Sequence, residues 1–228
     1  MAMNILSVDD FNYELLGKYP RLRRNNRKQG KRYVDCITAF DIETTRLKSI
    51  EQAIMYIWQF QIDEYTIVGR TWEEFRRFVI GLKQYLSGAY LVVYVHNLSF
   101  EFQFLKGIYS FQADEVFATD NRKILKCLMM DCLEFRCSYM LTGLSLEQFT
   151  KRYNVESQKL SGAEFDYDKV RYPDTPLTDR EMEYCINDVK GLVQALQKKL
   201  NVEGYTLASI PLTKTGYVRN DVRKALKN

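Results

Sequence analysis

The chain has 228 residues, of which 46% are hydrophobic and 14% aromatic, and this suffices for one sizeable domain with a packed core. Its formal net charge is +4, and it contains a single histidine, His96. One histidine excludes histidine-rich metal sites. It also excludes Ser–His–Asp and Cys–His hydrolases unless His96 itself is the catalytic histidine. Hydrolytic chemistry would therefore rest mainly on carboxylates, tyrosine and lysine.

The cysteines and the apolar runs indicate where in the cell the protein is expected. The five cysteines form no CxxC pair and match no zinc-binding spacing, so we interpret them as reduced core residues of a cytoplasmic protein. They are Cys36, Cys127, Cys132, Cys137 and Cys185. No apolar run approaches the roughly 18 residues of a membrane span, and the N-terminus lacks a secretory signal. We expect no membrane partner.

Residues 1–32 are polar and weakly patterned, and we interpret them as a basic N-terminal extension. Eight of the 33 basic residues lie between Gly17 and Arg32, where there is no acid, so the remaining 25 are outnumbered by 29 acids. A mildly acidic body with a basic arm suits contact with a phosphate backbone. A solvated tail explains the same composition equally well.

Runs rich in β-branched and aromatic residues predict strands at 33–43, 54–62 and 64–70. A Thr-x-x-Glu capping box then begins a helix expected at about 72–86, and an apolar run predicts a buried strand at 89–96.

The second half of the chain also contains both predicted strands and predicted helices. Residues 99–106 resemble a helix, and residues 115–137 hold two or three strand-like runs. Capping boxes begin a short helix after Ser145 and a long helix at about 179–199, separated by a loop at 157–177. The tail at 201–228 is less regular, with a helix possible after Arg219. This order predicts an α/β fold with a mixed sheet.

The first acidic cluster is Asp41-Ile42-Glu43, at the end of the first predicted strand. Alternation places Asp41 and Glu43 on one face and turns Ile42 toward the core. Two adjacent carboxylates repel each other unless a cation lies between them, so the pair could begin a divalent metal site. A strand-end pair of acids can equally be a solvated surface.

The second cluster follows the apolar strand at 89–96. In the run His96-Asn-Leu-Ser-Phe-Glu-Phe102, the acid Glu101 lies among aromatic residues at a helix start, where it would be buried or turned to a cleft. Asn97 could cap that helix or contact a ligand. Loops after buried strands commonly carry function in α/β sheets.

The third cluster is Tyr184-Cys-Ile-Asn-Asp188, within the long C-terminal helix. Tyr184 and Asp188 are four residues apart and share a helical face, an arrangement that alone is usually structural. Together, the three clusters resemble the DEDD exonucleases of the Tyr subtype. The His subtype would need histidine at the position of Glu183.

The residues within these motifs resemble a narrower family, the exonuclease domain of protein-primed family B DNA polymerases of phages and linear plasmids. The resemblance is carried by FDIETT (40–45), VHNLSFEFQFL (95–105), K-x(5)-F-D-Y (159–167) and YxxxD (184–188). It covers about 33–200. It implies an RNase H-like fold, with a mixed β-sheet flanked by helices, and a C-terminal segment at 201–228 leading toward a polymerase domain.

The resemblance also implies roles for individual residues in a 3′→5′ exonuclease that acts on single-stranded DNA ends. Two divalent metal ions, Mg²⁺ or Mn²⁺, would be bound by Asp41, Glu43, Glu101 and Asp188. Tyr184 would orient the attacking water, and Lys159 would assist at the scissile phosphate. The residues implied to hold the 3′ end are Thr44, Asn97 and Phe100, with Ser138 and Tyr167 as weaker matches.

Elementary chemistry agrees with this assignment. Two cations roughly 3.5–4 Å apart activate water and stabilise the leaving oxygen without a histidine. Carboxylates offset their charge, and an aromatic side chain such as Phe100 can stack on a terminal base. The family further implies proofreading in DNA replication, with a polymerase domain and a terminal protein as partners in a bacterial host cell.

The chain departs from the family's pattern in two ways. The second motif usually has aspartate, whereas here Glu101 carries one more methylene, which could weaken the second metal site. The chain also lacks a polymerase palm motif, so we expect no polymerase activity from it; it is either an excised fragment or a stand-alone nuclease. The alternatives are a weakly active or inactive single-strand-binding module of the same fold, and a ribonuclease of the same superfamily.

Overall fold

The computed structural model describes residues 4–23, 30–47, 51–119, 123–157, 166 and 168–226. Its described part is organised around an eight-stranded mixed sheet, in the order β1-β6-β5-β4-β7-β10-β9-β8. The pairs β1/β6, β4/β7 and β7/β10 are parallel, whereas the other neighbouring strands are antiparallel. The strands are β1 (Ile5–Leu6), β4 (Thr38–Leu47), β5 (Gln52–Ile62), β6 (Tyr65–Gly69), β7 (Leu91–Val95), β8 (Val116–Ala118), β9 (Ile124–Met129) and β10 (Leu133–Cys137).

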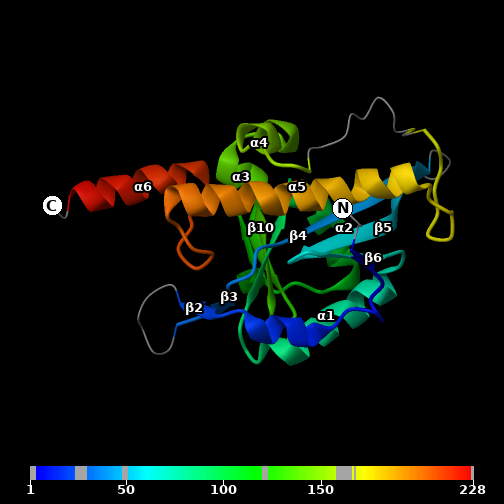
Figure 1. Ribbon diagram of the computed structural model, residues 1–228, viewed down its shortest axis with the longest axis horizontal. Helices are drawn as coiled ribbons and strands as arrows, with labels where there is room; N and C mark the ends of the chain where they lie inside the picture. Colours follow the sequence, from blue (N-terminus) through cyan, green and yellow to red (C-terminus); the bar gives the residue numbers. More distant parts are fainter. Residues whose placement is uncertain are drawn as a thin grey trace.

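Helices cover both faces of this sheet, as Figure 1 shows for the long helix α5 on one side and α1 on the other. The α-helices are α1 (Trp72–Leu86), α2 (Leu98–Ile108), α3 (Ser138–Thr142), α4 (Leu146–Arg152), α5 (Asp179–Glu203) and α6 (Lys214–Ala225). One apolar core lies between the sheet and α1 with α2, and a second lies beneath α5 and α4. The predicted α/β class, with a mixed sheet flanked by helices, is confirmed.

The three predicted capping boxes are all present and begin α1, α4 and α5. In each box the side chain of the first residue accepts a hydrogen bond from the backbone N–H three residues on. The acid or amide at that later residue accepts in return from the backbone N–H of the first residue. Helix α5 runs past its expected end to Glu203, because the next residue, Gly204, adopts a left-handed conformation (φ +67°) that stops it. Helix α6 also begins earlier than expected, at Lys214.

The single strand predicted at 33–43 was wrong in its extent. The chain instead forms β3 (Arg32–Val34), which pairs with β2 (Arg21–Arg23) in a separate two-stranded sheet, and then β4. The two strands are separated where the Asp35 backbone N–H donates to the carbonyl of Pro20. A tertiary hydrogen bond thus interrupts an apolar run that local patterning cannot divide.

Part of the basic N-terminal segment packs onto the sheet and α1. Strand β1 lies parallel to β6 at one edge of the large sheet. After it, Val8, Phe11 and Leu16 are buried in the core that α1 covers, and the Phe11 ring meets the Phe78 ring edge-on at 5.6 Å. The described part of this segment therefore adds to the hydrophobic core.

The five cysteines are all buried as free thiols. Within the described residues, no helix combines the length and the apolar character that crossing a bilayer requires.

Candidate active site

The site lies where β4 and β7 part. These neighbouring parallel strands pair only at Thr38–Val93 and Ala39–Tyr94. Strand β7 then ends at Val95 and the chain turns into α2, while β4 continues alongside β5 for eight more residues. The carboxyl end of β7 therefore faces an open flank of β4, and side chains from β4, α2 and α5 can meet there.

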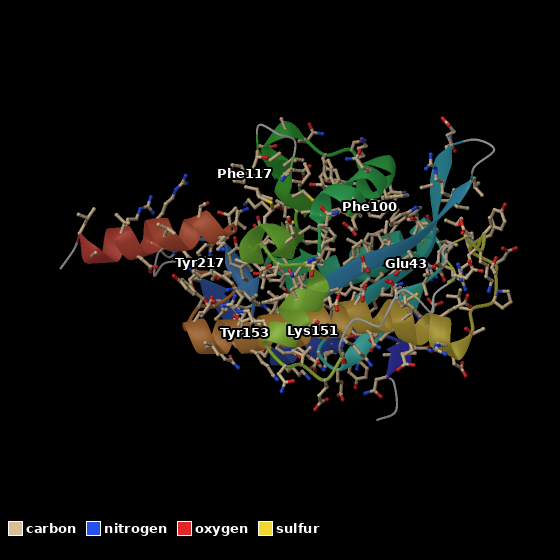
Figure 2. All side chains as sticks on the ribbon, turned by 90° about the horizontal axis from the view of Figure 1, so that it is seen from above. Glu43, Phe100, Phe117, Lys151, Tyr153 and Tyr217 are labelled. Atoms are coloured by element: carbon tan, nitrogen blue, oxygen red, sulfur yellow. The ribbon has the colours of Figure 1, made fainter. Side chains whose placement is uncertain are left out.

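Strand β4 supplies Asp41 and Glu43 to this opening. The two side chains alternate with Ile42, which is 4% exposed and belongs to the core on the opposite face. The register between β4 and β5 shifts immediately after Glu43, between it and Thr44. Such a bulge bends the strand and redirects the side chains beside it. Glu43 is half-buried, and Figure 2 labels it on this strand.

Helix α5 crosses the same face and brings Asp188 and Tyr184 to the strand. One carboxylate oxygen each from Asp41, Glu43 and Asp188 lie within 4.8 Å of one another. Burial, followed by the charges of these three carboxylates, raises the pKa of the neighbouring Cys185 thiol. The two acidic clusters at 41–43 and 184–188 therefore form one site.

Glu101 approaches the same group from α2. Its side chain is 4% exposed and lines a pocket of about 290 Å³ together with the three other acids and Tyr184. Burial, and next the charge of Asp41, raise the pKa of Glu101 well above its usual range. A bound cation would act against both causes, because a positive charge favours the ionised form of a nearby carboxyl.

The donor set fits divalent cations with a preference for oxygen ligands. Four carboxyl groups converge from three elements, and oxygen-rich carboxylate sites suit Mg²⁺ and Mn²⁺. The pocket also contains Phe100, whose side chain is 41% exposed and is labelled in Figure 2. An exposed ring beside a carboxylate cluster could contact a base.

A second pocket adjoins the first through His96 and Leu146 and is also lined by Asn97 and Tyr139. Asn97 occupies the N-cap position of α2 with φ +80°, but its side chain makes no cap hydrogen bond to the helix. His96, which lines both pockets, was not among the predicted site residues. Its following Asn-x-x-Phe-acid run was the signal that could have drawn attention to it.

Ser138 and Thr44 lie outside the lining of both pockets. Ser138 is fully buried, its Oγ lies 2.9 Å from His96 Nδ1, and its hydroxyl donates to the Val95 carbonyl at 3.3 Å. Ser138 thus orients His96. Thr44 is half-buried at the bulge of β4. Lys159 and Tyr167 lie outside the described residues.

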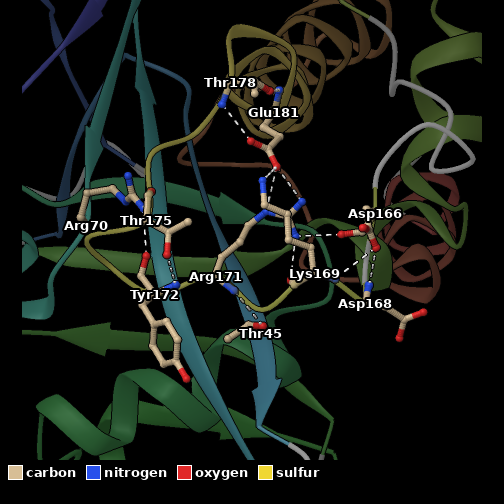
Figure 3. Close-up of polar contacts among 10 residues, drawn as sticks. All are labelled: Thr45, Arg70, Asp166, Asp168, Lys169, Arg171, Tyr172, Thr175, Thr178 and Glu181. Carbon is tan, nitrogen blue, oxygen red and sulfur yellow. Dashed lines mark hydrogen bonds and ion pairs between the residues drawn. The ribbon is translucent and has the colours of Figure 1, made fainter.

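A partly buried ion pair holds the start of α5 against β4. Arg171, 2% exposed, donates from Nε and Nη2 to the Glu181 carboxylate at 3.0 and 2.7 Å (Figure 3). Its Nη1 donates to the carbonyls of Asp166 and Lys169, and its backbone N–H donates to Thr45 Oγ1. The pair therefore joins β4, the preceding loop and the first turn of α5, one turn before Tyr184.

The charge of Glu181 is stabilised by these contacts. Burial alone would raise its pKa, but hydrogen bonds from the Thr178 backbone, Lys169 and Arg171 lower it to about 2. Residues 157–177 were predicted as a loop, and the Arg171–Glu181 pair was missed because no short-range pattern joins two residues that are 10 positions apart.

The comparisons with known proteins agree with this geometry. Residues 26–204, well over half of the chain, match the family model described as 3'-5' exonuclease. A search of the curated proteins found no match. The large mixed sheet flanked by helices is consistent with the RNase H-like exonuclease fold.

Several solved structures share the fold. The chain is similar to Phi29 DNA polymerase complexed with single-stranded DNA, with a TM-score of 0.60, 16% identity and coverage of 75% of this chain and 32% of that one. It is similar to the ternary complex of the same polymerase with primer-template DNA and incoming nucleotide substrates (TM-score 0.60, 17% identity, 75% and 31% coverage). It is also similar to the orthorhombic crystal form (TM-score 0.59, 16% identity, 78% and 32% coverage). The chain thus spans about a third of each of these proteins.

Proposed function

The chain belongs to the 3'-5' exonuclease family, and we propose that it removes nucleotides one at a time from the 3′ end of single-stranded DNA. The observation that carries the proposal is the convergence of Asp41, Glu43 and Asp188 within 4.8 Å, beside the buried Glu101. No histidine is needed for this chemistry, since carboxylates and metal ions suffice for phosphodiester hydrolysis.

Asp41, Glu43, Glu101 and Asp188 would hold two divalent cations, Mg²⁺ or Mn²⁺. When bound, the cations activate the attacking water and stabilise the charge on the leaving 3′ oxygen. In the overall reaction the water oxygen bonds to phosphorus, the bond from phosphorus to the 3′ oxygen of the penultimate nucleotide breaks, and a nucleoside 5′-monophosphate leaves. The released 3′ oxygen takes up a proton.

The remaining residues would orient the reactants. Tyr184, on the same face of α5 as Asp188, would hold the attacking water by a hydrogen bond. The ring of Phe100 would stack on the terminal base, and Asn97 in the adjoining pocket would contact the strand. We assign Thr44, Lys159 and Tyr167 to the DNA contacts or the scissile phosphate on the sequence resemblance. The buried Ser138, a weaker match, would act on the strand through His96.

The same resemblance extends the proposal to the protein's context. We propose that residues 33–200 form the exonuclease domain, preceded by a basic extension and followed by a segment leading toward a polymerase domain. Proofreading for a protein-primed polymerase in the cytoplasm of a bacterial host, with terminal protein as a further partner, is the role this domain would have.

A weakly active or inactive single-strand-binding module is the second candidate. It is favoured by Glu101, which is longer than the usual aspartate and whose pKa is raised by burial and next by the charge of Asp41. This candidate binds single strands in a salt-sensitive way without cleaving them.

The test is the cleavage of a 5′-labelled single-stranded DNA oligonucleotide with Mg²⁺, with Mn²⁺ or with EDTA. Asp41→Asn is the site variant, and Asp114→Asn, at an exposed position, is the matched control. We expect a ladder that shortens from the 3′ end in wild type and control only, and only with metal. Bound but uncut DNA under every condition would favour the binding module, and a parallel RNA substrate separates out a ribonuclease.

A further inference from the structure

Gln59, at the middle of β5, is a polar side chain enclosed in the fold. It is 0% exposed, and neither its amide nitrogen nor its amide oxygen has a hydrogen-bond partner among the described residues. Buried amides nearly always have partners, because losing water without replacement destabilises the folded protein. A buried glutamine whose amide is unbonded therefore points to a partner that it meets in another state of the protein.

The sheet register identifies the side chains that Gln59 faces. It lies directly opposite Asp41 on β4 and opposite Val68 on β6, and directly opposed residues of antiparallel strands share a face with roughly 5 Å between their Cβ atoms. Val68 offers no polar atom. Of its two direct cross-strand neighbours, Asp41 alone can therefore bond the Gln59 amide.

The neighbours of Gln59 along β5 offer its amide no hydrogen-bond partner either. Ile57, two residues before Gln59, is apolar and packs against Tyr184 and Cys185 beneath α5. Gln61, two residues after it, is already bonded, since its Nε2 donates to the Asp63 carbonyl at 2.8 Å and its Oε1 accepts from Thr66 Oγ1 at 2.5 Å. Gln59 and Gln61 thus share a strand, a face and full burial but differ in whether the amide is bonded.

We propose that Gln59 is a positioning residue of the acidic site, whose amide donates a hydrogen bond to the Asp41 carboxylate when that carboxylate binds a cation. The inference rests on the proposed metal-dependent function. The Asp41 carboxylate also interacts with the buried Glu101. Hydrogen bonds from outer-shell groups fix the orientation of ligating carboxylates and raise metal affinity.

The experiment compares wild type, Gln59→Met and the matched control Gln61→Met. Methionine keeps an unbranched chain of similar length and removes only the amide. Thermal unfolding in EDTA measures the stability of the metal-free protein, and calorimetric titration with Mn²⁺ alone measures metal affinity. Initial cleavage rates at several DNA concentrations then separate kcat from KM for DNA, and they are repeated at increasing Mn²⁺.

For Gln59→Met we expect a Tm in EDTA that equals the wild-type value or exceeds it by about 2–4 °C, because an unpaired buried amide is removed. Its Mn²⁺ affinity falls about 10-fold or more. The KM for DNA stays within about twofold, and kcat recovers at high Mn²⁺. For Gln61→Met we expect the reverse, a Tm lower by several degrees and an unchanged Mn²⁺ affinity, since Thr66 loses its partner.

Two results would overturn the inference while leaving the proposed function intact. One is an unchanged Mn²⁺ affinity in Gln59→Met, and the other is a loss of stability or of folding in EDTA like that of Gln61→Met, which would make Gln59 a structural residue of the metal-free fold. A wild-type protein that fails to bind Mn²⁺ would overturn the proposed function, and the inference with it.

Discussion

Asp41 and Asp188 are far apart in the sequence, yet a carboxylate oxygen of one lies within 4.8 Å of a carboxylate oxygen of the other. One is on a central strand and the other on the helix that crosses it. Two like charges this close destabilise the metal-free protein unless a proton or a cation is shared. The relationship links the proposed chemistry to stability, because a substitution that removes a ligand also removes repulsion.

Asp188→Asn should therefore separate activity from folding. We expect cleavage to fall by more than the roughly 10–100-fold that loss of an outer-shell partner causes, because a direct ligand is weakened. In EDTA the Tm should equal or exceed that of wild type. Gel-based cleavage and thermal unfolding measure the two effects, with Asp179→Asn, exposed on the same helix, as the control. A variant that cleaves at the wild-type rate would contradict the ligand assignment.

The Arg171–Glu181 pair predicts a dependence of stability on pH. The pKa of Glu181 in the folded protein, about 2, lies below its ordinary value of 4.5, so the unfolded chain binds more protons between these values. Its contribution is fully present above pH 4.5 and is lost as the pH falls toward 2. With Glu181 only 12% exposed, we expect Glu181→Gln to cost about 2 kcal/mol at pH 7 and progressively less below pH 4.

Urea unfolding of wild type and Glu181→Gln from pH 7 to pH 3 measures this difference. The control is Glu147→Gln, which removes an exposed pair with Lys151 and should give a small difference at every pH. A Glu181→Gln difference that stays constant with pH would show that the carboxylate charge does not stabilise the fold.

Local patterns in the sequence predicted the elements that hold the site. The capping boxes located the starts of α1, α4 and α5, because caps depend on residues only three apart. Alternation put Asp41 and Glu43 on one face, and helical spacing joined Tyr184 to Asp188. Their convergence with Glu101 followed from the family resemblance, since no periodicity states which strand a helix will cross.

Long-range contacts account for what the sequence analysis missed. The break at Asp35 depends on a hydrogen bond to Pro20, and Arg171 reaches Thr45 across the fold. The core residues Val8, Phe11 and Leu16 are too widely spaced in a polar segment to form a period. Gln59 fits the ordinary alternation of a strand. Only the structure reveals that its amide has no hydrogen-bond partner among the described residues.

Shortening Glu101 tests how the site has adapted to the extra methylene. Glu101→Asp withdraws the carboxyl by about one C–C bond from Asp41 and leaves a small gap at a position that is 4% exposed. We expect activity to fall about 10-fold, with a shift to higher Mn²⁺ requirement. Initial rates across a Mn²⁺ series measure it. An activity above that of wild type would mean that glutamate itself weakens the second metal site.

Tyr184→Phe removes one hydroxyl from the site and keeps the ring that packs against Tyr56 and Ile57. If the hydroxyl orients the attacking water, kcat should fall about 10–100-fold, while KM for DNA and Mn²⁺ affinity stay near wild type. Single-turnover cleavage and Mn²⁺ calorimetry distinguish the two quantities. Equal losses in metal affinity and rate would instead assign Tyr184 to the support of the carboxylates.

Phe100→Ala tests the contact with the terminal base. The ring is 41% exposed beside the carboxylates, and stacking of one base on an aromatic ring contributes about 1–3 kcal/mol. We therefore expect KM for single-stranded DNA to rise about 10-fold, with a smaller change in kcat at saturating DNA. The matched control is Phe117→Ala, a 52% exposed ring on the edge strand β8 (labelled in Figure 2) that does not line the carboxylate pocket. Because both substitutions remove an exposed ring, a general effect on the fold would change both variants alike, whereas a stacking contact changes only Phe100→Ala.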